Sequence, residues 1–349
     1  YKQGTTDKVA EDKVVVGQTF DSTVTENAIG VTGYTAVEPT TQELKLDKYN
    51  KEITFYYTVN QYGYTIEYYF DDVLQDDLTV TGTAAYESTI NYEDKCPAGY
   101  VLDKTIPDAE NLPLTIGTDE SANVIKVYYK KNVFTLTIHY VYEDGSEAKP
   151  DHTTSVEYGK GYSVDSPAID GYKADKLKVE GTMPANDVEV TVTYTKRSDL
   201  SYTVYYYWNG TTTPVANSKT VDKQTYNATV TESPATIGGY TAVSDETQTI
   251  TIGTGENKII FYYYKNVELT ANSDTATYDG TVKSVSGFTG APADADFTAI
   301  TVGAKGTNAG TYPAEFAEGT VGTVDKTEKY KVTVANNGKL TITPVTDEV

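Results

Sequence analysis

This 349-residue chain contains an internal repeat with a period near 70 residues, which limits the folds open to it. Residues 1–58 and 207–264 match almost from end to end, and both carry the strings GTT, TVTE, GYTAV and FYY. Two looser copies lie between them, at 64–130 and 137–195. A period of this length is long for a solenoid and is typical of a row of small domains.

A Gly-Tyr pair near the middle of each copy sets the spacing. The pairs are Gly33-Tyr34, Gly99-Tyr100, Gly171-Tyr172 and Gly239-Tyr240, and successive tyrosines are 66, 72 and 68 residues apart. The spacing predicts copies at 1–60, 61–133, 134–197 and 198–266, and a module of another type at 267–349. We expect the first copy to lack its opening strand.

The closing strand of each copy shows which side chains face inward. One phase is apolar or aromatic in every copy: Ile53/Ile125/Val190/Ile259, Phe55/Val127/Val192/Phe261 and Tyr57/Tyr129/Tyr194/Tyr263. The other phase admits Lys and Thr, as in Thr54/Lys126/Thr191/Ile260. Because successive strand residues point to opposite faces, this alternation predicts a half-buried strand with the apolar phase inside.

The opening strand follows the same rule. Its apolar phase is Ile66/Ile138/Val204, Tyr68/Tyr140/Tyr206 and Phe70/Tyr142/Trp208. Residues that accept turn dihedral angles come next: Asp71-Asp72, Glu143-Asp144-Gly145 and Asn209-Gly210. The segment after Val267 has different strands, with Tyr278-Asp279-Gly280 predicting a hairpin, Asn337-Gly338 a turn, and Pro344 the end of the last strand.

Composition agrees with an all-β chain and excludes some partners. The 32 tyrosines, together with many Val, Thr and Ile residues, suit pleated surfaces. The net charge is −22 and Arg197 is the one arginine, so nucleic acid is excluded as a partner and anionic partners should bind poorly. Cys96 is the one cysteine, which rules out an intrachain disulfide and is typical of bacterial surface proteins among extracellular ones.

The third copy, with its apolar strand, YEDG turn, central DGY and closing VTVTYT strand, resembles mucin-binding-protein (MucBP) repeats and the related B-repeats of Gram-positive surface proteins. The other copies look like divergent members of that group, and residues 267–349 resemble the YDG/MBG β modules. The resemblance implies an elongated tandem array of β-grasp-like modules in a cell-wall-attached adhesin. The group shares no ligand-binding motif that could be carried over to residues here.

No constellation of residues predicts catalysis. His139 aligns with Glu67 and Tyr205 in the variable phase, which favours an exposed structural histidine, and His152 has no paired cysteine. The carboxylates at Asp71, Asp72, Asp76, Asp77 and Asp119-Glu120 lack the spacing of a calcium loop, so we expect solvated turns, no cofactor and no metal site, with only weak surface Ca²⁺ binding left open. Cys96, before Pro97, is expected to be a spectator thiol.

Aromatic residues are the candidates for ligand contact. Trp208 aligns with Phe70 and Tyr142 in the apolar phase, so we expect it in the core rather than on a sugar. The fourth copy carries tyrosines in the variable phase of two strands that a β-grasp-like sheet places side by side: Tyr205, Tyr207, Tyr262 and Tyr264. Such a row can stack on carbohydrate at low entropic cost, or can simply supply strand propensity.

These observations predict a non-enzymatic, monomeric segment of an extracellular surface adhesin. Under one hypothesis the segment is a repeat stalk that contacts host mucin glycans or glycoproteins; under the second it is a passive stalk for a distal binding head. A third is a carbohydrate-binding accessory region of a surface glycosidase. No apolar run approaches the length of a membrane span, and no signal peptide is present, so we expect the targeting and anchoring signals to lie outside this segment.

Overall fold

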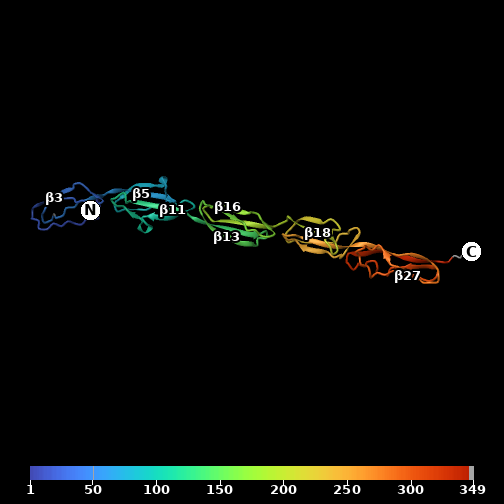
Figure 1. Ribbon diagram of the computed structural model, residues 1–349. Coiled ribbons are helices and arrows are strands. Elements are labelled where there is room, and N and C mark those ends of the chain that lie inside the picture. Colours follow the sequence, from blue (N-terminus) through green and yellow to red (C-terminus); the bar gives the residue numbers. More distant parts are fainter. Residues whose placement is uncertain (50, 346–349) are drawn as a thin grey trace. The chain divides into compact units, whose positions relative to one another are not determined.

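The computed structural model describes residues 1–49 and 51–345, and its regular elements are strands (Figure 1). Within those residues the helical elements are two short 3-10 turns, Asp76–Leu78 and Ala109–Asn111. The strands are distributed over many small sheets. The prediction of a mainly β chain is therefore confirmed. No helix in the described part of the chain has the length and apolar character needed to cross a membrane.

The chain divides into two compact units. The first comprises Tyr1–Val141, Glu147–Ser166 and Lys176–Val192, and the second comprises Tyr142–Ser146, Pro167–Asp175 and Thr193–Val349. The division passes through the third copy, so each unit contains part of that copy.

In the first unit, the first copy forms two antiparallel pairs. Strand β1 (Thr23–Asn27) pairs with β3 (Thr41–Lys45), and β2 (Tyr34–Ala36) pairs with β4 (Tyr57–Val59). The sequence predicts a closing strand that begins at Ile53. This start is wrong, because β4 begins only at Tyr57. In the second and fourth copies an opening strand lies parallel to the equivalent segment. In the first copy, an isolated parallel β-bridge joins Tyr57 of this segment to Lys2.

The second copy folds around two adjacent parallel strands, β5 (Gln61–Phe70) and β11 (Val124–Lys131). Antiparallel neighbours flank them: β6 (Val73–Leu74), β7 (Val80–Ala85) and β9 (Tyr100–Ile106), while β8 (Thr89–Ile90) pairs with β10 (Leu114–Thr115). The buried cluster consists of Ile66, Tyr68, Ile125, Val127 and Tyr129. These are residues of the apolar phase, which confirms the inward assignment for both strands.

The third copy has the sheet order β13-β12-β17-β15. In the first unit β12 (Val133–Tyr142) pairs with β13 (Glu147–Glu157), and β14 (Gly161–Asp165) pairs with β16 (Lys178–Thr182). In the second unit β15 (Tyr172–Ala174) pairs with the end of β17 (Val188–Lys196). The predicted turn at Glu143-Asp144-Gly145 is present, with Gly145 at a φ of +81°.

The fourth copy lies in the second unit and repeats the parallel pair. Strand β18 (Leu200–Trp208) runs parallel to β23 (Lys258–Ala271) and is flanked by β19 (Lys219–Gln224), while β21 (Tyr240–Ala242) flanks β23. Strands β20 (Thr229–Glu232) and β22 (Gln248–Thr251) form a separate pair. The core contains the apolar phase of both long strands, namely Val204, Tyr206, Ile259, Phe261 and Tyr263.

Strand β23 continues past residue 266 into the C-terminal region, so the predicted boundary falls inside a strand. Its second half pairs with β26 (Phe288–Thr289) and β29 (Tyr330–Asn336), and one cluster includes Val267, Leu269 and Val332. The remaining strands form two further sheets: β24 (Asp274–Thr277), β30 (Gly338–Thr343) and β28 (Gly310–Ala314), and β25 (Lys283–Ser286) with β27 (Gly303–Gly306). The last strand ends before Pro344, as predicted.

The hairpin predicted at Tyr278-Asp279-Gly280 is wrong. The residues do form a turn, since Gly280 has a φ of +80° and the Asp279 carboxylate accepts the Thr281 N–H at 2.9 Å. The strands on either side, however, pair with β30 and β27 and belong to different sheets. Turn chemistry reverses the chain locally, but the partners of a strand depend on which apolar faces must be covered. Asn337-Gly338 likewise joins strands of two sheets.

Candidate functional site

The four candidate tyrosines of the fourth copy lie on adjacent strands, as predicted. In the parallel register Tyr207 is opposite Tyr262 and Tyr205 is opposite Ile260. The alternating residues Tyr206, Phe261 and Tyr263 are buried on the other face. Tyr262 is 41% exposed, whereas Tyr205, Tyr207 and Tyr264 are half-buried. The candidates therefore share the outer face of the sheet, and Tyr262 is the most accessible of them.

Three of these rings form a continuous cluster. Tyr205 and Tyr207 stack with centroids 5.6 Å apart and planes 19° apart. Tyr207 and Tyr262 are tilted by 49°, with centroids 6.4 Å apart. Tyr264 lies further along β23, opposite Thr241 of β21. We call Tyr205, Tyr207 and Tyr262 the tyrosine cluster. Tyr205 and Tyr207 are half-buried and pack on each other. The ring of the cluster that is most exposed to solvent is therefore that of Tyr262.

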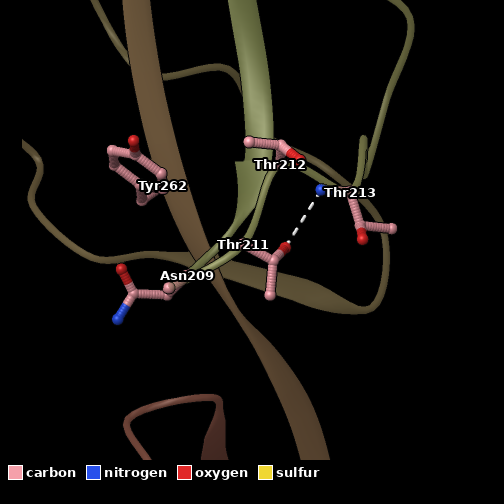
Figure 2. A pocket seen from close by; sticks show the side chains of 6 residues that line it. Asn209, Thr211, Thr212, Thr213 and Tyr262 are labelled. Carbon is pink, nitrogen blue, oxygen red and sulfur yellow. Dashed lines mark hydrogen bonds between the residues drawn. The ribbon is translucent and has the colours of Figure 1, made fainter.

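A shallow, open hollow of about 730 Å³ borders Tyr262. Figure 2 shows the Tyr262 ring beside Asn209 and the three threonines that line the hollow. The Asn209-Gly210 turn shapes it, since Gly210 has a φ of +72° and the Thr211 N–H donates to the Trp208 carbonyl at 3.0 Å. The Thr211 hydroxyl accepts the Thr213 N–H at 3.0 Å.

The chemistry of this surface suits a neutral, hydroxyl-rich ligand. One exposed aromatic face lies next to an amide side chain and the hydroxyls of Thr212 and Thr213, which together can stack on an apolar ring face and exchange hydrogen bonds with hydroxyls. The Thr211 hydroxyl donates its hydrogen to the Trp208 carbonyl at 2.9 Å. The lining residues, Asn209–Thr213 and Tyr262, include no carboxylate, imidazole or thiol.

The equivalent outer face of the second copy is covered by charged side chains. Tyr69 and Tyr128 stack with centroids 4.5 Å apart. The Lys104 ammonium lies 4.8 Å from the Tyr128 centroid, and Lys126 lies 5.8 Å from that of Tyr69. Tyr69 donates to the Glu67 carboxylate at 2.6 Å, and this hydrogen bond raises the pKa of Tyr69. Nothing in the alignment of copies indicates that Lys104, from β9, covers this pair.

Trp208 is partly buried, as its apolar phase suggested, but it lies outside the core cluster of its own copy. Its indole packs edge-on against Tyr330, with centroids 5.5 Å apart, and its Nε1–H donates to the Lys329 carbonyl at 2.9 Å. The Lys329 ammonium lies 5.5 Å from the ring. The expectation of a core position is thus corrected: Trp208 lies at the contact with the C-terminal strands, because β29 joins β23 at this end of the sheet.

His139, Cys96 and the carboxylates of Asp71 and Asp72 lie on strands, loops and turns at the protein surface. The His139 Nδ1 atom is 2.9 Å from the Asp151 carboxylate on the neighbouring strand. Cys96 is exposed, and partial burial of the thiol raises its pKa, which disfavours a reactive thiolate. Asp71 and Asp72 occupy a turn with φ values of 48° and 63°. Within residues 1–49 and 51–345, no group of three or more His, Cys, Asp and Glu side chains is arranged to hold a metal ion.

Comparison with known proteins identifies one domain. Residues 135–195 match the model of the MucBP domain. No protein with a curated description matches the sequence. Among solved structures, the type 2 repeat of the mucus binding protein MUB from Lactobacillus reuteri is 19% identical, covers 39% of this chain and 100% of its own length, and has a TM-score of 0.17.

Two further structures are similar at comparable levels. Mub-RV is 20% identical over 39% of this chain and 99% of its own, with a TM-score of 0.17. The Bacillus anthracis TIE protein is 14% identical over 64% of this chain and 52% of its own, with a TM-score of 0.31. The third copy of the repeat, at residues 135–195, is thus the part of this chain that matches the MucBP domain.

Proposed function

We propose that this chain is part of the repeat region of a cell-wall-attached adhesin of a Gram-positive bacterium. Its copies at 1–60, 61–133, 134–197 and 198–266 act as MucBP-type modules, followed by a YDG/MBG-type module at 267–349. The observation that carries the proposal is the MucBP match at 135–195, together with the same inward phase in the second and fourth copies.

We further propose that the fourth copy contacts neutral glycans through the tyrosine cluster and the Asn209–Thr213 loop. Tyr262 supplies the stacking surface, and the adjacent hydroxyl and amide groups supply hydrogen bonds. The net charge of −22 repels sialylated or sulfated chains, so neutral glycans are the favoured class. A glycan array probed with the full chain tests this, with neutral and sialylated mucin glycans side by side.

Replacing Tyr262 by alanine should weaken glycan binding by about tenfold, the effect of losing roughly 1.4 kcal/mol of ring contact. Tyr56→Ala is the matched control, because Tyr56 occupies the equivalent position in the first copy and is 45% exposed. Biolayer interferometry on an array-positive glycan measures both variants. An unchanged affinity in Tyr262→Ala would show that the tyrosine cluster is not the binding surface.

A passive stalk is the second candidate function, and the half-burial of Tyr205 and Tyr207 favours it, since these rings pack on each other instead of remaining open. This candidate predicts a blank array with every neutral and charged glycan. Binding of the chain to any mucin glycan, lost on Tyr262→Ala, would exclude it.

A further inference from the structure

In three of the four Gly-Tyr pairs the glycine lies directly against a ring from the next copy, whereas nothing lies within 4 Å of a Cβ added at Gly239. A side-chain Cβ at Gly33 would come within 2.1 Å of the Tyr86 ring. At Gly99 it would come within 2.6 Å of the Tyr158 ring. At Gly171 the distance to the Tyr226 ring would be 2.4 Å. Side chains never approach this closely, so in these three places only glycine leaves room for the ring.

In these three pairs the tyrosine packs edge-on against the same ring. The centroids of Tyr34 and Tyr86 are 5.8 Å apart, those of Tyr100 and Tyr158 are 6.1 Å apart, and those of Tyr172 and Tyr226 are 5.7 Å apart. The interplanar angles are 84°, 68° and 66°. Edge-to-face packing is one of the favoured arrangements of two aromatic rings, because the positive edge of one ring meets the negative face of the other.

A backbone bridge accompanies every one of these ring contacts. In the second joint the Asn132 N–H donates to the Gly99 carbonyl at 2.8 Å, and the Tyr158 N–H donates to the Asn132 carbonyl at 2.9 Å. Asn60 makes the same two bonds in the first joint, at 2.9 and 2.9 Å, and Arg197 makes them in the third, at 2.9 and 2.8 Å. The backbone of the residue at each of these joints therefore forms hydrogen bonds with both copies.

The turn that carries the ring is built alike in the four copies. The residue after the ring is in the left-handed region: Asp21, Glu87, Gly159 and Asn227 have φ values of 65°, 64°, 75° and 63°. In the first copy this turn carries Phe20, which the match of GQTFDSTV with KQTYNATV aligns with Tyr226. Phe20 is 74% exposed.

We propose that this ring is the docking element by which each copy holds the Gly-Tyr turn of the copy before it, and that Phe20 offers the same docking surface to the Gly-Tyr turn of a further MucBP-like copy. The three joints that contain a ring contact define the docking geometry. The first copy already has the same turn at Asp21, with Phe20 in the position of the ring. The inference does not depend on glycan binding by the tyrosine cluster.

The joint between the second and third copies can be tested in the full chain. Spin labels on the exposed Cys96 and on an introduced cysteine at the exposed Ser163 give a distance distribution across this joint. Gly99→Ala should replace a narrow distribution by a broad one. Gly145→Ala is the matched control, because Gly145 has a similar φ of +81° but nothing lies within 4 Å of an added Cβ.

A double-mutant cycle separates loss of the ring contact from a general disturbance of the fold by Gly99→Ala. Tyr158→Ala removes the ring and should also broaden the distribution. In the Tyr158→Ala background, Gly99→Ala should then have no larger effect than Gly145→Ala, because the clash has gone. Distributions that stay narrow in Gly99→Ala and Tyr158→Ala would overturn the docking role.

The Phe20 docking surface is tested by extending the chain. Because Tyr1 aligns with Tyr207, residues 134–206 placed before Tyr1 add a third-copy Gly171-Tyr172 turn in register. Hydroxyl-radical oxidation of Phe20 should fall in the extended chain, and Gly171→Ala in the added segment should restore it. Equal oxidation of Phe20 in the original and extended chains would contradict the proposal.

Discussion

Replacing Asp325 by alanine is expected to destabilise the C-terminal region by about 3 kcal/mol, because it leaves one buried and three partly buried N–H groups without their acceptor. Asp325 is 2% exposed. Its carboxylate accepts the backbone N–H groups of Lys329 and Tyr330 at 2.9 and 2.8 Å, and those of Thr327 and Asp296 at 3.1 and 3.2 Å. Burial alone would raise the pKa of this carboxyl, and the hydrogen bonds hold the pKa below its usual value.

Urea unfolding followed by the fluorescence of Trp208 measures this loss directly. Trp208 is the one tryptophan of the chain, and its ring contacts Tyr330, which follows the loop that Asp325 organises. Asp279→Ala is the control, since the Asp279 carboxylate is exposed and bonds within its own turn, to Thr281 and Lys283. Asp325→Asn should fall between the two. An unchanged urea midpoint in Asp325→Ala would falsify the structural role.

Stability should also fall steeply above about pH 10, the usual pKa of tyrosine. Burial raises the pKa values of Tyr68, Tyr129 and Tyr263, and a hydrogen bond from Tyr129 to Asp94 adds to the effect on Tyr129. Above pH 10 these residues ionise in the unfolded chain but remain protonated in the folded one. The folded state then binds more protons, so each such tyrosine lowers stability by up to about 1.4 kcal/mol per pH unit.

A pH titration of tyrosinate absorbance, combined with circular dichroism, checks this expectation. Exposed tyrosines should titrate first, and the buried ones should ionise only together with loss of the β signal. Tyr129→Phe should move the loss of structure in the second copy to higher pH, because one ionisable group is removed from the unfolded chain. Smooth titration of all tyrosines near pH 10 with the β signal intact would contradict the burial argument.

Comparison of the copies was sufficient to predict most of the sheet faces. The apolar phase at Ile259, Phe261 and Tyr263 is buried, and Tyr262 is exposed on the opposite face. This works because strand side chains alternate with a period of two, so a position that is apolar in every copy must face the core. The same alternation predicts that the candidate tyrosines lie on the outer face. Their adjacency then requires only that the opening and closing strands are neighbours, as they are in the fourth copy.

The hollow beside Tyr262 and the cover over Tyr69 and Tyr128 could not be predicted in the same way. The first depends on how the Asn209–Thr213 loop folds back toward β23, and the second depends on Lys104 from a strand far along the chain. Long side chains and loops reach across strands in ways that alternation does not encode. The same limitation applies to the ring contacts of Gly33, Gly99 and Gly171, although the recurring Gly-Tyr pair was visible in the sequence.

From the residues alone one can predict that the chain is a β protein built from copies of one unit, and which face of each long strand is buried. The pairing of strands beyond the repeat, as at Tyr278-Asp279-Gly280, and the contacts of the Gly-Tyr pairs and Trp208 emerge only from the folded chain. The difference lies in the range of the interactions. Alternation and turn dihedral angles are properties of a few neighbouring residues, whereas pairing and ring docking depend on surfaces brought together from distant parts of the chain.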